Sequence, residues 1–195
     1  MFAELLRLEF DLPDDQVALL EAHYDLLCRW NQVLNLTAIY KVEEAVERHY
    51  WESLFLTRYL PPNPLNIVDI GSGAGFPGFP VAVVRPDCTL TLVESHQRKA
   101  VFLREATRSI RNVRVLGVRA ESIRQEFDHA VSRAVSYQDL AKSLKFLAPT
   151  VDLLTGAEEP PPDLGFRWEP SVRLPWGDQR FLRRGSGVSR GTSGM

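Results

Sequence analysis

A glycine-rich segment that follows directly on an apolar run is the feature that most constrains this chain. The run 67–70 predicts a short buried strand, and Gly71, Gly73 and Gly75 come immediately after it. Glycine permits positive φ angles and lets the backbone approach a ligand closely. In α/β sheets such a turn lies at the carboxyl end of a strand, where ligands bind. The segment therefore predicts a parallel sheet with a ligand loop at one edge.

The chain beyond this segment alternates short strand patterns with helical patterns. Further strands are predicted at 89–93, 113–116, 130–132 and 151–154, and helices at 80–84, 97–109 and 137–147. Two closing strands are predicted at 166–172 and 180–182. Alternation of this kind is typical of the α/β class with a doubly wound, mostly parallel sheet.

The first 60 residues predict helices that pack on this sheet as an N-terminal extension. Pro13 and Asp14 suit a helix start, because proline fits the first turn and an acid lies near the positive end of the dipole. A second helix is predicted over 42–59, and the prolines of 61–64 end it. We expect an extension over 1–60, a ligand-binding core over 65–184 and a disordered tail over 185–195, which is rich in Gly and Ser.

Bulk properties exclude several classes of protein. The chain has 195 residues, enough for one domain with a substantial core, and a net charge of -2. No apolar run approaches the roughly 18 residues of a membrane span, and the acidic N-terminus does not suggest a secretory signal. Cys28 and Cys88 lack the spacing of a metal site. We therefore expect a cytoplasmic protein, without a metal, that acts as a monomer.

Two acids beside the glycine segment bear on the identity of its ligand. In the dinucleotide pattern GxGxxG the third glycine falls where this chain has Phe76. Asp69 suits a cationic amino group better than a pyrophosphate, and Glu94, at the end of the next strand, can accept both hydroxyls of a ribose. Together they match the pattern of methyltransferases that use S-adenosylmethionine (SAM). The alternatives are an NAD(P)-dependent oxidoreductase, or a tight turn with two solvated acids.

Short motifs spread in order over residues 15–155 carry a more specific resemblance. They are Asn35-Leu36-Thr37-Ala38-Ile39, Arg48-His49, Glu52-Ser53-Leu54, Asp69 to Pro80, Thr91 to Ser95, Lys99, Phe102-Leu103, Ala120-Glu121, Phe127-Asp128 and Ser132-Arg133-Ala134. In these motifs the chain resembles the bacterial small-subunit ribosomal RNA guanine-N7 methyltransferases, also called glucose-inhibited division protein B. The resemblance implies a Rossmann-like SAM-methyltransferase fold.

The resemblance also implies a cofactor, a substrate and a set of site residues. The cofactor would be SAM, and the substrate N7 of a guanosine in 16S rRNA, in the small ribosomal subunit or an assembly intermediate. Glu94 would hold the ribose, Ala120 and Glu121 would flank the adenine, and Arg133 would lie beside the cofactor and the incoming base. The full set for the cofactor is Asp69, Gly71, Gly73, Gly75, Phe76, Glu94, Ala120, Glu121 and Arg133.

The sequence shows no acid-base constellation, and this chemistry does not require one. Guanine N7 carries a lone pair at neutral pH, so an enzyme has only to align it with the methyl group and exclude water. Arg133 and His49 are the candidates for positioning the base. Each has a plainer reading: Arg133 as a salt-bridge partner of Asp128 or Asp139, and His49 as a core residue.

A basic stretch points to a polyanionic partner. Between Arg98 and Arg124 there are eight Lys or Arg residues and only two acids, on a chain that is slightly acidic overall. Such a run is often only a solvated helix face, but it also suits phosphate contacts. The candidates for RNA binding are Arg98, Lys99, Arg104 and Arg108.

The chain departs from the family pattern in three places. Glu52 stands where the family usually has Asp, and Thr155-Gly156 where a lysine-glycine often follows the fifth strand. The segment after it is short and rich in proline, so we expect the helix that normally follows to be missing. Two other functions stay open beside rRNA methylation: methylation of a small molecule, and RNA binding without catalysis.

Overall fold

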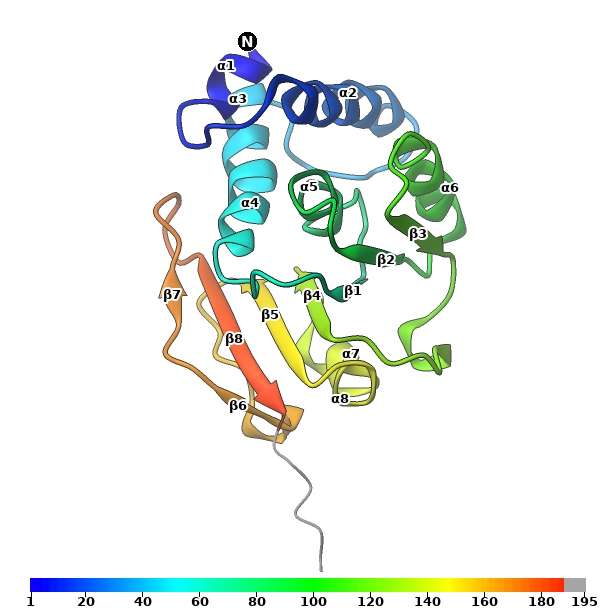
Figure 1. Ribbon diagram of the computed structural model, residues 1–195, viewed down its shortest axis with the longest axis vertical. Helices are drawn as coiled ribbons and strands as arrows, with labels where there is room; N and C mark the ends of the chain where they lie inside the picture. The colour runs from blue at the N-terminus through cyan, green and yellow to red at the C-terminus, as the bar shows by residue number, and fades with distance from the viewer. Residues whose placement is uncertain (188–195) are drawn as a thin grey trace, which may run out of the picture.

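The apolar runs of the sequence form one central sheet (Figure 1). The structure is a computed structural model, and it describes residues 1–187. The strands lie in the order β3-β2-β1-β4-β5-β8-β6, with β7 paired to β8. The parallel strands are β1 (Asn66–Ile70), β2 (Thr89–Val93), β3 (Val113–Leu116), β4 (His129–Arg133) and β5 (Thr150–Thr155). The antiparallel strands are β6 (Phe166–Trp168), β7 (Val172–Arg173) and β8 (Phe181–Gly187).

Strand β1 lies between β2 and β4, and this arrangement determines where a ligand can bind. The chain passes outward from β1 through β2 to β3 and then returns to the other side of β1 at β4. Ligands of open α/β sheets bind at such a reversal, outside the carboxyl ends of the strands. The glycine segment, Glu94 and Arg133 lie at the carboxyl ends of β1, β2 and β4 respectively. The topology therefore brings the predicted site residues to one edge of the sheet.

Helices cover both faces of the sheet, because the parallel strands are apolar on both sides. One face carries the N-terminal helices together with α5 and α6, and the other carries α7 and α8 (Figure 1). The first group comprises α1 (Phe2–Leu6), α2 (Asp14–Asn31), α3 (Val42–Ala45), the π-helix η1 (Val46–Trp51), α4 (Glu52–Thr57), α5 (Gly78–Val84) and α6 (Gln97–Ala106). The second comprises the short helix η2 (Ala120–Ser122), α7 (Tyr137–Ala141), α8 (Leu144–Leu147) and η3 (Pro162–Leu164).

The predicted fold class, a doubly wound α/β sheet, is confirmed, and some element bounds differ. The helix expected over 137–147 is two short helices, α7 and α8, separated around Ser143. The strand expected over 166–172 is also two strands, because Pro170 lies between β6 and β7 and cannot donate to a ladder. Between 156 and 165 the only helix is the 3₁₀ turn η3, so the expected loss of a helix after β5 is confirmed.

The tail was predicted to begin at Gly185, and this boundary is wrong. Strand β8 continues to Gly187. Gly185 and Ser186 pair with β5, and Gly185, Ser186 and Gly187 all pair with β6. Glycine and serine have low strand propensity, but pairing on both sides overrides that preference. The remainder of the predicted tail, 188–195, lies outside the described residues. Among the residues that are described, no helix has the length and apolar character of a membrane span.

Candidate functional site

The segment Gly71–Gly75, called the glycine turn below, crosses the end of β1 toward β2. The amides of Gly71 and Ser72 both donate to the Val93 carbonyl, at 2.9 and 3.0 Å. Gly71 has a φ of +70°, and a Cβ there would lie 2.4 Å from Cγ2 of Val135. No other residue fits this position without strain, because both the backbone angle and the space require glycine. The turn therefore exposes bare backbone at the carboxyl edge of the sheet.

Asp69 lies beneath the turn and is completely buried. Its Oδ2 accepts a hydrogen bond from the Gly78 amide at 3.0 Å, and its Oδ1 has no partner within the described residues. Burial is the largest influence on this carboxyl and raises its pKa to about 7. The hydrogen bond from Gly78 acts in the opposite direction but is weaker. An unpartnered buried oxygen is costly, so Asp69 is suited to receive a donor or a cation from a ligand.

Glu94 joins the turn to the end of β2. Its Oε2 accepts from the Gly73 amide at 3.0 Å and its Oε1 from the His96 amide at 2.7 Å. The side chain is buried, with 8% of its surface exposed. Each carboxylate oxygen can accept a second hydrogen bond. Glu94 is therefore oriented by backbone donors while it keeps capacity for the hydroxyls of a ligand.

A cavity of about 240 Å³ opens beside the glycine turn, and we call it the turn cavity. It brings together three of the predicted cofactor residues, Gly71, Ala120 and Glu121. Val135 and Asp139 also line it; the sequence did not point to Val135, and it pointed to Asp139 only as a possible salt-bridge partner of Arg133, which pairs with Glu52 instead. They follow β4, and no motif in that segment signals their role. The remaining lining residues are Ile70, Val93, Ser95, Val118 and Arg119.

Phe76 lies in an aromatic cluster; it is one of six predicted cofactor residues that do not line the turn cavity, the others being Asp69, Gly73, Gly75, Glu94 and Arg133. It is buried with 3% of its surface exposed and does not line the turn cavity. Its ring stacks on His49 at 4.7 Å and meets the edges of His23 and Tyr50 at 5.3 and 5.1 Å. The His23 ring in turn hydrogen-bonds the Ala74 carbonyl at 3.0 Å. Phe76 therefore supports the turn from below, and its contact with the cofactor stays a prediction.

Arg133 and His49, the two candidates for positioning a base, contact each other. Arg133 donates to Nδ1 of His49 at 2.8 Å and to the Arg48 carbonyl at 2.5 Å, and its guanidinium lies 5.2 Å from the Phe76 ring. Because arginine can only donate, His49 Nδ1 must accept, and its Nε2–H then donates to Thr37 Oγ1 at 2.8 Å. Burial first, and then Arg133, lower the pKa of His49 to about 2. His49 is thus a neutral acceptor whose lone pair is already in use.

Three arginines surround Glu52, and we call this group the arginine cluster. Glu52 is fully buried and accepts two hydrogen bonds from Arg180, at 2.9 and 2.7 Å. Arg48 and Arg133 approach the same carboxylate to 3.4 and 3.8 Å. One acid thus faces three cations on the rim of the site. The sequence pointed to Glu52 as a departure from the family, but no local pattern signals its pairing with Arg180, which is 128 positions away.

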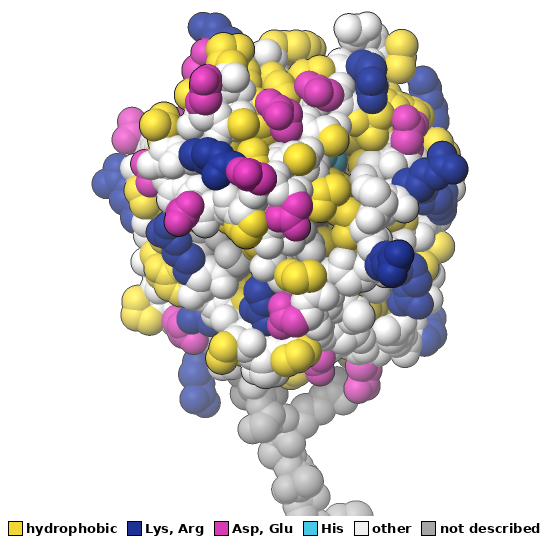
Figure 2. All heavy atoms as spheres, turned by 45° about the horizontal axis from the view of Figure 1, so that its top comes forward, with side chains coloured by type: hydrophobic (Ala, Val, Ile, Leu, Met, Phe, Trp, Pro, Cys, Tyr) yellow, Lys and Arg dark blue, Asp and Glu magenta, His cyan; other side chains and the backbone are white. Residues whose placement is uncertain are grey.

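The predicted RNA-binding residues lie on or just after α6, which begins close to Glu94. Arg98, Arg104 and Arg108 are exposed and Lys99 is half-buried. Within residues 1–187 none of the four forms an ion pair, and Arg98 makes a single weak contact with the Val33 carbonyl, at 3.3 Å. Figure 2 shows Lys and Arg side chains along its right-hand edge, the side on which α6 lies in Figure 1. These cations are therefore available to a partner.

Comparison with known proteins identifies the family. The sequence pattern of the GidB family, described as rRNA small subunit methyltransferase G, matches residues 16–152. The chain belongs to the GidB family. The match runs from α2 into β5, so it includes the glycine turn, Glu94 and Arg133. The resemblance drawn from the sequence is confirmed.

Curated relatives of the GidB chain carry the name Ribosomal RNA small subunit methyltransferase G. That of Dichelobacter nodosus is 44% identical over 133 residues, which cover 66% of this chain and 63% of the relative. That of Desulforamulus reducens is 38% identical over 138 residues, or 66% and 58% of the two chains. That of Halorhodospira halophila is 40% identical over 140 residues, or 71% and 65%. The matched part of this chain thus spans less than two thirds of the length of these relatives.

Solved structures support the fold of the GidB chain. A SAM dependent methyltransferase from Aquifex aeolicus gives a TM-score of 0.58 at 16% identity, over 74% of this chain and 93% of that one. The ribosomal protein L11 methylase from Lactobacillus delbrueckii subsp. bulgaricus gives 0.56 at 12% identity, over 69% and 76%. At such identities the likeness concerns the fold alone. The predicted Rossmann-like SAM-methyltransferase fold is confirmed.

The part of the GidB chain that lies outside the family match completes the rim of the site. The match ends at Asp152, within β5, so the loop after β5 and all of β6 to β8 follow it. This part supplies Arg180 to the arginine cluster and Thr155-Gly156 to the end of β5. The turn and its acids therefore lie within the family match, whereas part of the rim lies outside it.

Proposed function

We propose that this chain transfers a methyl group from SAM to N7 of a guanosine in 16S rRNA. It acts in the cytoplasm, as a monomer, on the small ribosomal subunit or on one of its assembly intermediates. The observation that carries the proposal is the glycine turn between two buried acids, Asp69 and Glu94, in a chain of the GidB family. The name of the relatives gives the class of substrate, and the choice of N7 rests on the family resemblance.

The residues around the glycine turn suit SAM. Asp69 Oδ1 is buried and without a partner, which favours the cationic amino group of an amino acid. Glu94, held by two backbone amides, keeps acceptor capacity for the ribose. Gly71 has no Cβ, so its backbone lies directly against Val135 and lines the turn cavity. When bound, SAM supplies a methyl group activated by a positively charged sulfur.

The part of this chain in the reaction is to bind and orient the base and to exclude water. Guanine N7 already carries the lone pair that accepts the methyl group, so no proton has to be removed first. The surroundings of His49 agree with this, because its Nδ1 is occupied by Arg133 and its pKa is about 2. Arg133, fixed by His49 and the Arg48 carbonyl, is a planar donor that can orient the base or a neighbouring phosphate.

The exposed cations of α6 are our proposed site for the RNA backbone. Affinity for RNA depends on phosphate neutralisation by Lys and Arg, and it falls as salt rises. Arg98, Arg104 and Arg108 are exposed and carry no internal ion pair within the described part of the chain. A methyltransferase with a small neutral substrate would not need such a surface, so this observation favours RNA over a small molecule.

The experiment that tests the proposal is methyl transfer from labelled SAM to small ribosomal subunits from cells that lack this protein. We expect label at N7 of one guanosine of 16S rRNA, mapped by mass spectrometry, and none in subunits that already carry the modification. Label in a small molecule of a cell extract, and none in RNA, would identify the alternative enzyme. RNA binding without transfer would identify a module that has lost catalysis.

A further inference from the structure

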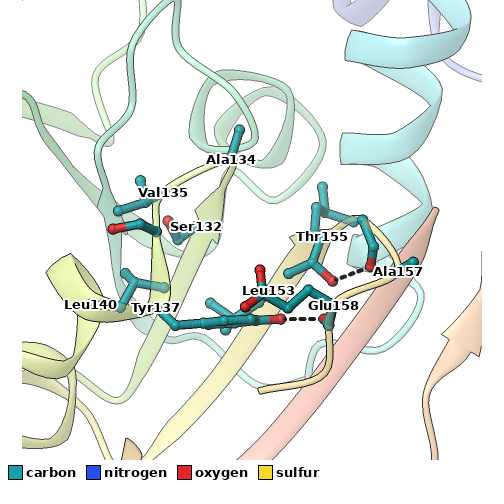
Figure 3. A pocket seen from close by; sticks show the side chains of 12 residues that line it. Ser132, Ala134, Val135, Tyr137, Leu140, Leu153, Thr155, Ala157 and Glu158 are labelled. Carbon is teal, nitrogen blue, oxygen red and sulfur yellow. Dashed lines mark hydrogen bonds between the residues drawn. The ribbon is translucent and has the colours of Figure 1, made fainter. Parts of the chain in front are cut away.

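A second cavity, of about 360 Å³, opens at the carboxyl ends of β4 and β5, and we call it the side cavity (Figure 3). It adjoins the turn cavity, because Val135 lines both. Val135 also lies directly against the glycine turn, where its Cγ2 occupies the space beside Gly71. Any group that enters the side cavity is therefore separated from the turn cavity by little more than one side chain.

The lining of the side cavity suits a planar ring. Leu140 from α7 and Leu153 from β5 provide apolar surface, and Tyr137 adds an aromatic ring. Polar groups are few, with Ser132 and Ser136 on the β4 side. An apolar cleft with a few convergent polar groups is typical of a small-ligand site, and aromatic side chains stack on unpaired RNA bases.

Glu158 supplies the one carboxylate of the side cavity. It comes from the loop after β5 and lies beside Tyr137 of α7 (Figure 3). The Tyr137 hydroxyl donates to the Glu158 backbone carbonyl at 2.9 Å, which fixes the loop against α7. The side-chain carboxylate of Glu158 has neither a hydrogen bond nor an ion pair within residues 1–187. The neighbouring Glu159, by contrast, is paired with Arg183. Only Glu158 is thus available to a ligand.

Arg183 holds this loop in place. It lies on β8 and is 2% exposed. It donates to Thr155 Oγ1 at 3.2 Å and to the Ala157 carbonyl at 3.2 Å, and it also contacts Ser171 and Glu159. A buried arginine with this many partners fixes the loop over residues 155–159. The loop lies beyond Asp152, where the match to the family ends.

The geometry points to the side cavity as the pocket for the target guanine, with Glu158 accepting hydrogen bonds from N1–H and N2–H₂ of the base. This inference rests on the proposed function. Guanine alone among the four RNA bases carries two adjacent donors on its pairing edge, and an ionised carboxylate only accepts. Adenine and cytosine place an acceptor there, and uracil has a single donor between two carbonyls. Since N7 lies across the ring system from N1 and N2, the same pose leaves N7 free to face the cofactor.

The test compares the affinity of the chain for two short single-stranded RNAs. One contains a single guanosine, and in the other inosine takes the place of that guanosine. Inosine lacks the 2-amino group. We expect the wild-type chain to bind the guanosine RNA about tenfold more tightly, because one charge-assisted hydrogen bond is lost with inosine. Glu158→Gln should bind both RNAs equally, while its affinity for SAM stays unchanged. Glu169→Gln is the control, since Glu169 follows β6 and lies outside the side cavity. It should keep the tenfold preference.

Equal binding of the two RNAs by the wild-type chain, or a preference that survives in Glu158→Gln, would overturn the inference. Methyl transfer to 16S rRNA is measured on the same preparations. A preference for guanosine without any transfer would contradict the proposed function and leave the pocket standing. Transfer to a guanosine without this preference would leave the function standing and contradict the pocket.

Discussion

The glycine turn and the arginine cluster lie at one site but are built in different ways. The turn is fixed by backbone contacts with the neighbouring strand, such as the Gly71 and Ser72 amides on the Val93 carbonyl. The arginine cluster is fixed by side chains from distant parts of the chain, since Glu52 and Arg180 are 128 positions apart. The turn belongs to the family match, and Arg180 does not. The difference teaches that the turn is local and lies within the family match, whereas the rim depends on the completed fold.

The largest effect is expected in the arginine cluster, where Glu52→Leu removes the one carboxylate among three cations. Loss of one partner of a buried ion pair costs roughly 3–5 kcal/mol. The arginines are 15–34% exposed, which puts the expected loss in unfolding free energy at the lower end, about 3 kcal/mol. Urea unfolding measures it, with Glu52→Asp as the control that keeps the charge. A loss below about 1 kcal/mol would mean that the cluster does not hold the rim together.

The start of α5, which packs on Asp69 beneath the glycine turn, should instead be sensitive to volume. A Cβ on Gly78 would lie 2.3 Å from Leu92 Cδ2 and 2.6 Å from Asp69 Oδ2. Overpacking of this kind costs about 1–3 kcal/mol, so we expect Gly78→Ala to lower the unfolding free energy by about 2 kcal/mol. Gly156→Ala is the matched control on the rim, because its nearest atom is 4.0 Å away. Equal effects of the two substitutions would erase the contrast between the two regions.

A pH dependence follows from the raised pKa of Asp69, about 7 against an ordinary 3.8. Between these values the folded chain holds a proton that the unfolded chain releases. Stability from this group is thus present at low pH and is lost as pH rises toward 7. Asp69→Asn has no proton to release and does not show this loss of stability. As pH rises from 5 to 7, the unfolding free energy of the variant should therefore increase by roughly 2 kcal/mol relative to that of the wild type. Above pH 7 the difference should stay constant. Parallel unfolding free energies across this range would contradict the burial of a titrating acid there.

Glu94→Ala tests the link between the turn and the ligand. We expect a weaker affinity for SAM by ~1–3 kcal/mol, since the ribose hydroxyls lose their acceptor and the Gly73 amide loses its partner. Calorimetric titration measures the dissociation constant. Glu126→Ala, an exposed acid away from the turn cavity, should leave it unchanged. An unchanged constant in Glu94→Ala would count against its assignment to the cofactor.

The smallest effect per residue is expected on α6, outside both regions. If Arg104 contacts a phosphate, Arg104→Ala should reduce the slope of log affinity against log salt by about 0.7 for single-stranded RNA. Filter binding at several salt concentrations measures the slope. Arg167→Ala on β6, also exposed, is the control. A slope that does not change in Arg104→Ala, or changes as much in the control, would remove α6 from the RNA surface.

The sequence predicted the turn better than the rim for a physical reason. Asp69, Gly71 and Glu94 lie on or directly after two neighbouring strands, and short-range patterns place such residues correctly. Contacts such as Arg133 with His49, 84 positions apart, form only when the sheet and the N-terminal helices come together. No local pattern encodes them, and the same holds for Arg180.

The sequence pattern also did not predict which neighbours surround a given side chain. Phe76 follows the glycine turn as a cofactor contact would, yet it packs among His23, His49 and Tyr50. Sequence spacing places a residue along the chain but not on a face of a turn, so Phe76 in the core and Phe76 at the cofactor could not be told apart. The strand formed by Gly185 and Ser186 was missed for a related reason, since only its pairing partners make it a strand.

Calorimetry of the wild-type chain with SAM and with NADH is the most direct test of the site as a whole. A bare-backbone turn between Asp69 and Glu94 should bind one SAM per chain and no NADH. Binding of NADH in place of SAM, or of neither, would contradict the assignment of the glycine turn to a sulfonium nucleoside.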